Sequence, residues 1–168
     1  MPLTTYVSGE VLTAASLNAN LSFAATNPTS KIAQVVNAVY AVATTTTSTS
    51  YVTSGLSATI TPTLNTSKIL VLMSNSFAMN GANDGIFTLF RGTVAGTDLA
   101  TTSAIGFASL YVGGSNPTSA PGGLTYLDSP ATTSATTYTI GIKCKSGGQC
   151  IAQQQATMGV LTLIEVLV

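Results

Sequence analysis

From residue 31 to its end, the chain is a succession of short runs rich in Val, Ile and Tyr, separated by Gly, Pro, Ser and Thr. Runs of this kind favour β-strands, and turn signals follow one another at intervals of about ten residues. No alternation of strands with helices supports a parallel sheet. The pattern predicts an all-β fold: an antiparallel β-sandwich, jelly-roll-like, with about eight strands.

Within this pattern, residues 67–80 form a long strand with apolar side chains on both faces. The turn sequence "GAND" follows, and residues 85–93 are expected to return as its hairpin partner. Residues 136–144 alternate, with Tyr138, Ile140, Ile142 and Cys144 on one face. Residues 114–123 are dense in Gly and Pro and are expected to form a loop.

The first 30 residues differ from the rest and predict a short amphipathic helix. Thr13 can cap it, and Ala14, Leu17, Leu21 and Ala24 then recur at helical spacing. Pro28 ends the pattern, because the residue before a proline avoids the helical region. We therefore expect two parts, an N-terminal segment over residues 1–30 and a sandwich over residues 31–168. A helix of about twelve residues is marginal alone and needs a surface to pack on.

Charged residues make up only 6% of the chain, and five basic residues balance five acidic ones. An ordinary soluble domain carries about 25%. Such a surface has no electrostatic footprint for nucleic acid. It also lacks the net charge that keeps a free monomer soluble. The composition favours a surface covered by copies of the chain or by other proteins.

The longest apolar run, residues 158–168, is too short to span a bilayer and contains Glu165. The N-terminus lacks the basic and apolar regions of a secretory signal peptide. We therefore expect synthesis in a cytoplasm and no insertion into a membrane.

The chain contains few of the side chains on which enzyme catalysis usually depends. The chain has no His, which removes the commonest general base and the Ser-His-Asp arrangement. No two of its five carboxylates are close in sequence, so a glycosidase pair would require long-range folding. We expect neither an enzyme nor a bound metal or cofactor. The single arginine, Arg91, is expected to pair with Asp84 or Asp98, or to serve as an interface contact.

Cys144 and Cys150 are the two cysteines, with five residues between them. If those five form a hairpin loop, the two residues face each other across a strand pair and are a candidate disulfide. Two reduced, half-buried thiols are the alternative. A zinc site lacks the further His or Cys ligands that it needs.

Tyr111, Tyr126 and the intervening loop with Asn116 are candidates for a receptor-facing rim, because aromatic faces are good platforms for sugars. Packing in the core or at a subunit interface explains the two tyrosines as well.

The opening stretch "YVSGEVLTAASLNANLSFA" resembles the N-terminal segment of many bacteriophage tail-fibre and related virion proteins, which attaches the fibre to the particle. There an aromatic residue precedes the pattern G-x-V-L-T-A-x-x-L-N. Here the matching residues, in order, are Tyr6, Gly9, Val11, Leu12, Thr13, Ala14, Leu17 and Asn18.

A second resemblance lies downstream. "KIAQVV", a Thr/Ser run, an "ITP" turn and "SKILV" are similar in order to the β-sandwich domains of phage fibre proteins, as are "IFTLFRGT" and "TYTIGIKC". The departure is length, because long fibres carry a shaft between the attachment segment and the head.

The resemblance implies a structural virion protein, made in the host bacterial cytoplasm: a short tail fibre or a tail or baseplate appendage. A capsid decoration or head-fibre protein is the alternative, and a polysaccharide-acting enzyme is a weaker one. It implies a homo-oligomer, a trimer in related proteins, bound to other phage structural proteins and in contact with a host cell-surface polysaccharide or protein. The residues assigned to attachment and the oligomer interface are Tyr6, Val11, Leu12, Leu17, Asn18, Leu21 and Phe23.

Overall fold

The computed structural model describes residues 13–15, 18, 31–81, 83–114 and 117–168. The chain divides into two units, Met1–Lys31 and Ile32–Val168. In the second unit the structure consists of β-strands and one short 3-10 helix, Gln154–Ala156. The prediction of an all-β sandwich is confirmed there. The N-terminal helix lies almost wholly outside the described residues and stays a prediction.

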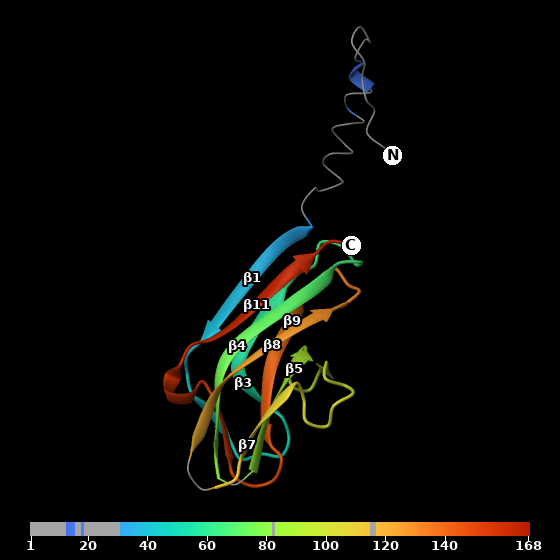
Figure 1. Cartoon of the computed structure of the whole chain (residues 1–168). Helices are drawn as coiled ribbons and strands as arrows, with labels where there is room; N and C mark the ends of the chain where they lie inside the picture. Colours follow the sequence, from blue (N-terminus) through green and yellow to red (C-terminus); the bar gives the residue numbers. More distant parts are fainter. Residues whose placement is uncertain (1–12, 16–17, 19–30, 82, 115–116) are drawn as a thin grey trace. The chain divides into compact units, whose positions relative to one another are not determined.

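The strands form two antiparallel sheets that pack face to face (Figure 1). The first sheet contains β1 (Ile32–Tyr40), β2 (Thr44–Thr46), β4 (Lys68–Asn80), β8 (Thr118–Asp128), β10 (Gln149–Ala152) and β11 (Gly159–Val166). The second sheet contains β3 (Val52–Ile60), β5 (Asn83–Arg91), β6 (Thr97–Asp98), β7 (Ala108–Val112) and β9 (Thr136–Cys144).

At three positions in the two sheets, two short strands together occupy the place of one strand: β1 and β2, β10 and β11, and β6 and β7. One edge of β4 pairs with β11 and then β10, whose own outer neighbours are β1 and β2, while the other edge pairs with β8. In the second sheet, β6 and β7 share one edge of β5. Counting each such couple as one strand gives eight strands, which can be numbered along the chain. Their order is then 1-8-3-6 across the first sheet and 2-7-4-5 across the second. This is the strand order of a jelly roll.

The hairpin expected between residues 67–80 and 85–93 does not form. β4 and β5 belong to different sheets, and the chain crosses the sandwich between them. The reason is that both edges of β4 are occupied, by β8 on one side and by β10 and β11 on the other. β5 pairs instead with β9 and β7.

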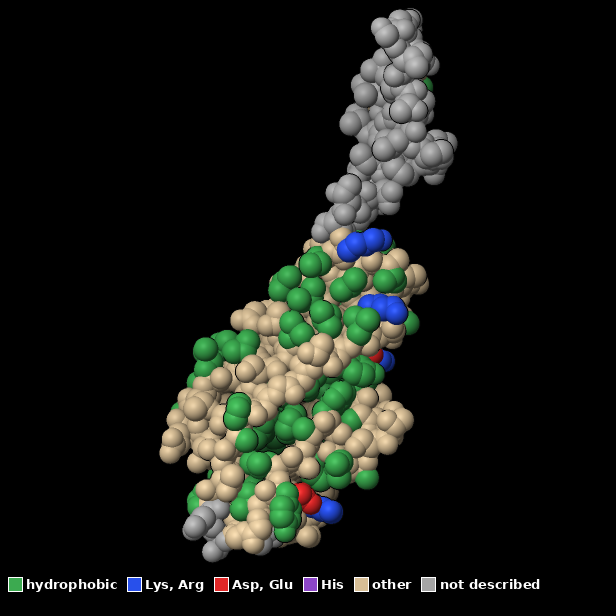
Figure 2. All heavy atoms as spheres, viewed as in Figure 1, with side chains coloured by type: hydrophobic (Ala, Val, Ile, Leu, Met, Phe, Trp, Pro, Cys, Tyr) green, Lys and Arg blue, Asp and Glu red, His purple; other side chains and the backbone are tan. Residues whose placement is uncertain are grey.

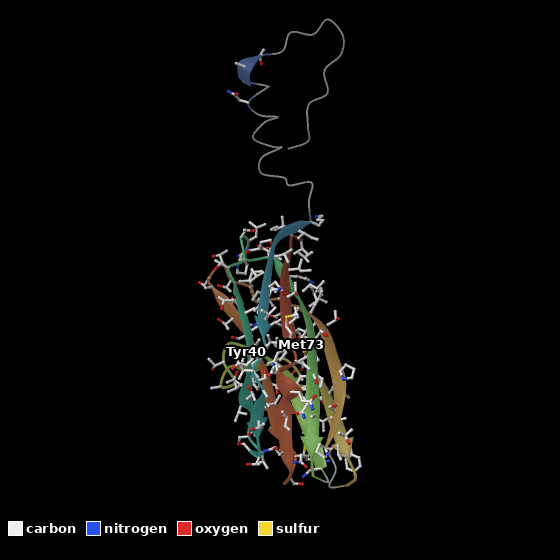
Figure 3. The ribbon with its side chains drawn as sticks, turned by 90° about the vertical axis from the view of Figure 1, so that its left-hand side faces the viewer. Tyr40 and Met73 are labelled. Atoms are coloured by element: carbon white, nitrogen blue, oxygen red, sulfur yellow. The ribbon has the colours of Figure 1, made fainter. Side chains whose placement is uncertain are left out.

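The core fills the space between the sheets. Alternate residues of each strand point into it, as the pattern in β9 predicts, where Tyr138, Ile140, Ile142 and Cys144 are fully buried. The other fully buried apolar side chains include Leu56, Ile60, Ile69, Val71, Met79, Leu89, Leu161 and Leu163. Met73, labelled in Figure 3, joins them from the middle of β4.

Gly55 permits the close approach of β1 and β3 at one side of the sandwich (Figure 3). Its φ is +85°, and a Cβ there would lie 2.2 Å from the ring of Tyr40. A side chain at this position meets both backbone strain and a clash with an aromatic ring. We expect Gly55→Ala to lower the free energy of unfolding by about 2 kcal/mol, measured by urea denaturation.

Gly114→Ala is the matched control, because a Cβ at Gly114 meets nothing within 4 Å. We expect this variant to unfold within about 0.5 kcal/mol of the wild type. Equal stability of the two variants would show that Tyr40 does not constrain position 55.

Candidate functional site

The predicted attachment residues fall in the first unit. Asn18 is the one member of that set within the described residues, where it has a helical backbone conformation. Tyr6, Val11, Leu12, Leu17, Leu21 and Phe23 lie outside them. The attachment site therefore stays a prediction from the sequence.

The structure separates the two tyrosines of the predicted receptor-facing rim. Tyr111 lies on β7 in the second sheet, opposite Asp84, and its side chain is exposed. Tyr126 lies on β8 in the first sheet, half-buried, with its ring 5.4 Å from that of Phe107 in an edge-to-face arrangement. Asn116 lies outside the described residues. The two tyrosines therefore lie on different sheets, and Tyr126 packs against the core.

The loop expected over residues 114–123 is also wrong in its second half, because β8 begins at Thr118. Backbone pairing with the whole length of β4, from Met79 to Ile69, outweighs the Gly and Pro content of this stretch. Pro121 is tolerated because β8 is an edge strand, paired on one side in the described sheet, and the other side needs no ladder hydrogen bond.

This strand creates a cleft that the sequence did not reveal. It lies between β7 and β8, has a volume of about 260 Å³, and is lined by Leu110, Pro121, Gly122 and two stacked phenylalanines. The rings of Phe77 and Phe87 lie parallel at 4.2 Å between centroids. A Cβ at Gly122 would lie 2.6 Å from the Phe77 ring, so glycine lets β8 cross the aromatic face.

The lining of this cleft contains no titratable side chain, and Ser109 supplies its hydroxyl group. Apolar and aromatic walls with few polar groups suit binding rather than acid–base chemistry. The cleft can accept the apolar face of a sugar ring or an apolar side chain of a protein.

The two cysteines do not face each other across a hairpin. Cys144 ends β9 in the second sheet, and Cys150 lies in β10 in the first. Both are buried free thiols. The Sγ of Cys150 occupies the space left by Gly85, the residue paired with Cys144, since a Cβ on Gly85 would lie 3.1 Å from that sulfur.

Burial favours the protonated form of both thiols. Burial, with a smaller contribution from Cys144, raises the pKa of Cys150 to about 12, and burial also raises the pKa of Cys144. The Cys144 thiol donates to the carbonyl oxygens of Thr46 and Gly148, at 3.4 and 3.6 Å. The thiolate is the reactive form of cysteine, so burial lowers the reactivity of both side chains.

Arg91 pairs with neither of its predicted partners. Asp84 pairs with Lys145 at 3.1 Å, and Asp98 accepts a hydrogen bond from Thr88. Arg91 instead binds both carboxylate oxygens of Asp128, with Nε 2.7 Å from Oδ2. Sequence reasoning missed this pair because Asp128 ends a strand of the other sheet.

Asp128 has a second partner, the hydroxyl of Tyr138, which donates to Oδ2 at 2.6 Å. Burial, followed by this hydrogen bond, raises the pKa of Tyr138, and the hydrogen bond with Asp128 raises the pKa of Arg91. We call Arg91, Asp128 and Tyr138 the inter-sheet clamp, because it joins β8 of the first sheet to β5 and β9 of the second.

Glu165 is a second buried carboxylate, fully shielded from solvent. It accepts hydrogen bonds from Gln34 at 2.6 Å, from the backbone and hydroxyl of Thr63 at 2.7 and 2.8 Å, and from Ser67 at 2.6 Å. Burial alone would raise the pKa of Glu165, but the hydrogen bonds from Ser67, Gln34 and Thr63 outweigh it and lower the pKa to about 2.

Asp128 and Glu165 flank Ile69 on the two neighbours of β4, so the fold does bring two carboxylates together. Two strand spacings separate them by about 10 Å. Ile69 between them is fully buried, and each carboxylate is occupied by donors from the protein. The two carboxylates thus join strands and sheets, and neither of them lines the cleft between β7 and β8.

Among the described residues, no group of three or more His, Cys, Asp or Glu side chains could hold a metal ion. No helix in that part of the chain is long and apolar enough to cross a membrane.

A scan against protein-family models finds no match. A search of the curated proteins also finds none.

Proposed function

We propose that this chain is a structural protein of a bacteriophage particle, a short tail fibre or a tail or baseplate appendage. Residues 1–30 attach it to the particle and the sandwich projects. The order of these two parts carries the proposal: the jelly roll begins at Ile32, directly after the segment that resembles fibre attachment segments. A capsid decoration or head-fibre protein is the alternative location for the same architecture.

The proposed partners are further copies of this chain, as a trimer, and other structural proteins of the particle. The low charge of the chain supports this, because an almost neutral surface favours burial against other proteins. The proposed place of synthesis is the host bacterial cytoplasm. The role is mechanical, with no catalytic step assigned to any residue.

Recognition of the host surface is part of the proposal and is assigned to the cleft between β7 and β8. Its apolar lining, in which Leu110 and Pro121 lie beside the buried rings of Phe77 and Phe87, suits the apolar face of a sugar ring. The ligand would be a cell-surface polysaccharide or an exposed protein segment.

Attachment is tested by adding charge to the apolar stripe of the N-terminal segment. The full chain with Leu17→Lys and Leu21→Lys should be at least about tenfold less abundant on purified particles, because each leucine contributes about 2 kcal/mol when buried. Quantitative mass spectrometry of particles assembled with the variant measures its copy number.

The control carries Asn20→Lys and Ser22→Lys, which add the same charge off the stripe. We expect wild-type copy numbers for this variant. Equal incorporation of both variants would exclude attachment through the stripe. Hydrolysis of host polysaccharide by the purified wild-type chain would contradict the structural role.

A further inference from the structure

The outer face of the first sheet contains one apolar row that runs across four strands. Its outward-pointing residues lie in rows that follow the strand register from β1 through β11 and β4 to β8. One row consists of Val35, Ile164, Leu70 and Leu127, and we call it the ridge. Val35 is 58% exposed and Leu127 is 50% exposed, although both are large aliphatic side chains.

A hollow of about 320 Å³ lies beside the ridge on the same face. The next two rows line it, Thr162, Leu72 and Thr125, then Val160, Ser74 and Gly123, and four of these six residues are smaller or more polar than those of the ridge. The face therefore presents a raised apolar row next to a depression. Figure 2, which looks onto this sheet, shows hydrophobic side chains spread over the strands and charged ones only along the margin.

The size of this face matches a protein interface. Four strands about 4.8 Å apart, taken over the eight residues of β11 at about 3.3 Å per residue, cover about 510 Å² in projection. The accessible area of a surface with side chains exceeds its projection, which brings it close to the 800 Å² or so that each partner contributes to a stable interface.

Charge favours a copy of the chain as the partner. The rows from Val35 to Val39 contain no charged side chain, and the nearest on this face is Lys68, beyond the ridge. Self-association brings like surfaces together, so a charged face would repel its copy, whereas a neutral one does not. The ridge and the hollow offer complementary shapes, one for the other.

We propose that the outer face of the first sheet, formed by β1, β11, β4 and β8, is the surface through which this chain binds a second copy of itself. The inference rests on the self-association included in the proposed function and names the residues that carry it. The proposed interface does not include the inner face of the sheet, the core or the cleft between β7 and β8.

The test compares two double variants of the full chain by sedimentation equilibrium. Val35→Lys with Leu127→Lys places two charges on the ridge. Val42→Lys with Ile105→Lys is the control, because Val42 is 60% exposed in the loop after β1 and Ile105 is 46% exposed in the loop before β7 of the second sheet. We expect the wild type and the control to have a mass several times that of one chain, and the ridge variant to have the mass of one chain.

An oligomeric ridge variant with a folded circular dichroism spectrum would overturn the assigned interface and leave the virion role standing. A monomeric wild type at high concentration would overturn the self-association as well. If the ridge variant does not fold, hydroxyl-radical footprinting of the wild type decides. Leu127 must be protected at high concentration and reactive at low concentration, while Tyr111 on β7 stays reactive throughout; equal reactivity of Leu127 at both concentrations contradicts the interface.

Discussion

Replacing Asp128 by alanine should lower the free energy of unfolding by about 3 kcal/mol, the lower end of the cost of removing one partner from a buried ion pair, because the Arg91 side chain is 32% exposed. The variant loses the contacts of Asp128 with Arg91 and Tyr138, and the buried Tyr138 hydroxyl keeps no acceptor. The clamp joins two sheets, so its loss affects the whole sandwich. Tm should fall by about 10 °C in scanning calorimetry.

Asp84→Ala is the matched control for this prediction. Asp84 forms the other ion pair of the described residues, with Lys145, whose side chain is 60% exposed. An exposed pair contributes less than about 1 kcal/mol, so the control should unfold close to the wild type. A similar loss of stability in both variants would contradict the role assigned to the clamp.

Replacing Glu165 by glutamine should lower the free energy of unfolding at neutral pH by about 3 kcal/mol. The folded pKa of about 2 lies below the ordinary value of 4.5, and each pKa unit corresponds to about 1.4 kcal/mol. Glutamine has nearly the same shape, but its amide nitrogen replaces one carboxylate oxygen and so faces either the donor of Gln34 or the donors of Ser67 and Thr63. One of these donors is then left without an acceptor in a buried site.

The same residue predicts how stability depends on pH. Because the pKa of Glu165 is lower in the folded state, its contribution is complete above about pH 4.5 and is lost as the pH falls toward 2. Urea denaturation of wild type and Glu165→Gln between pH 2 and 7 measures the difference. The two curves should converge at low pH, and a constant difference across that range would exclude an ionised Glu165 in the folded state.

The sandwich itself was predictable because its strands carry local signals. The alternation in β9 identifies the buried residues from Tyr138 to Cys144, and β4 stands out by its length and apolar content. Such patterns depend on neighbouring residues and on which face of a strand is buried.

The connections between strands were not predictable in the same way. The turn after β4 and the loop between Cys144 and Cys150 both signal a reversal of the chain, but each leads into the other sheet. A turn sequence shows that the chain changes direction. Which strand it then pairs with depends on edges that distant segments have already occupied, as β8, β10 and β11 occupy those of β4.

Of the candidate sites, one carried a signal in the sequence and the others did not. Glu165 lies on the inward-pointing face of β11, as do Leu161 and Leu163. This alternation could have identified Glu165 as a buried carboxylate. The partners of Asp128 offered no such signal, since they come from other strands far along the chain. The cleft between β7 and β8 was missed because glycines and a proline suggested a loop where pairing with β4 creates a strand.

An electron cryomicroscopy map of the virus particle that encodes this chain tests the central proposal most directly. We expect copies of the jelly roll on the tail, fibres or baseplate, grouped about a symmetry axis with the outer faces of their first sheets in contact. Density on the capsid surface would select the decoration role instead. Purified particles without the chain would contradict the structural role altogether.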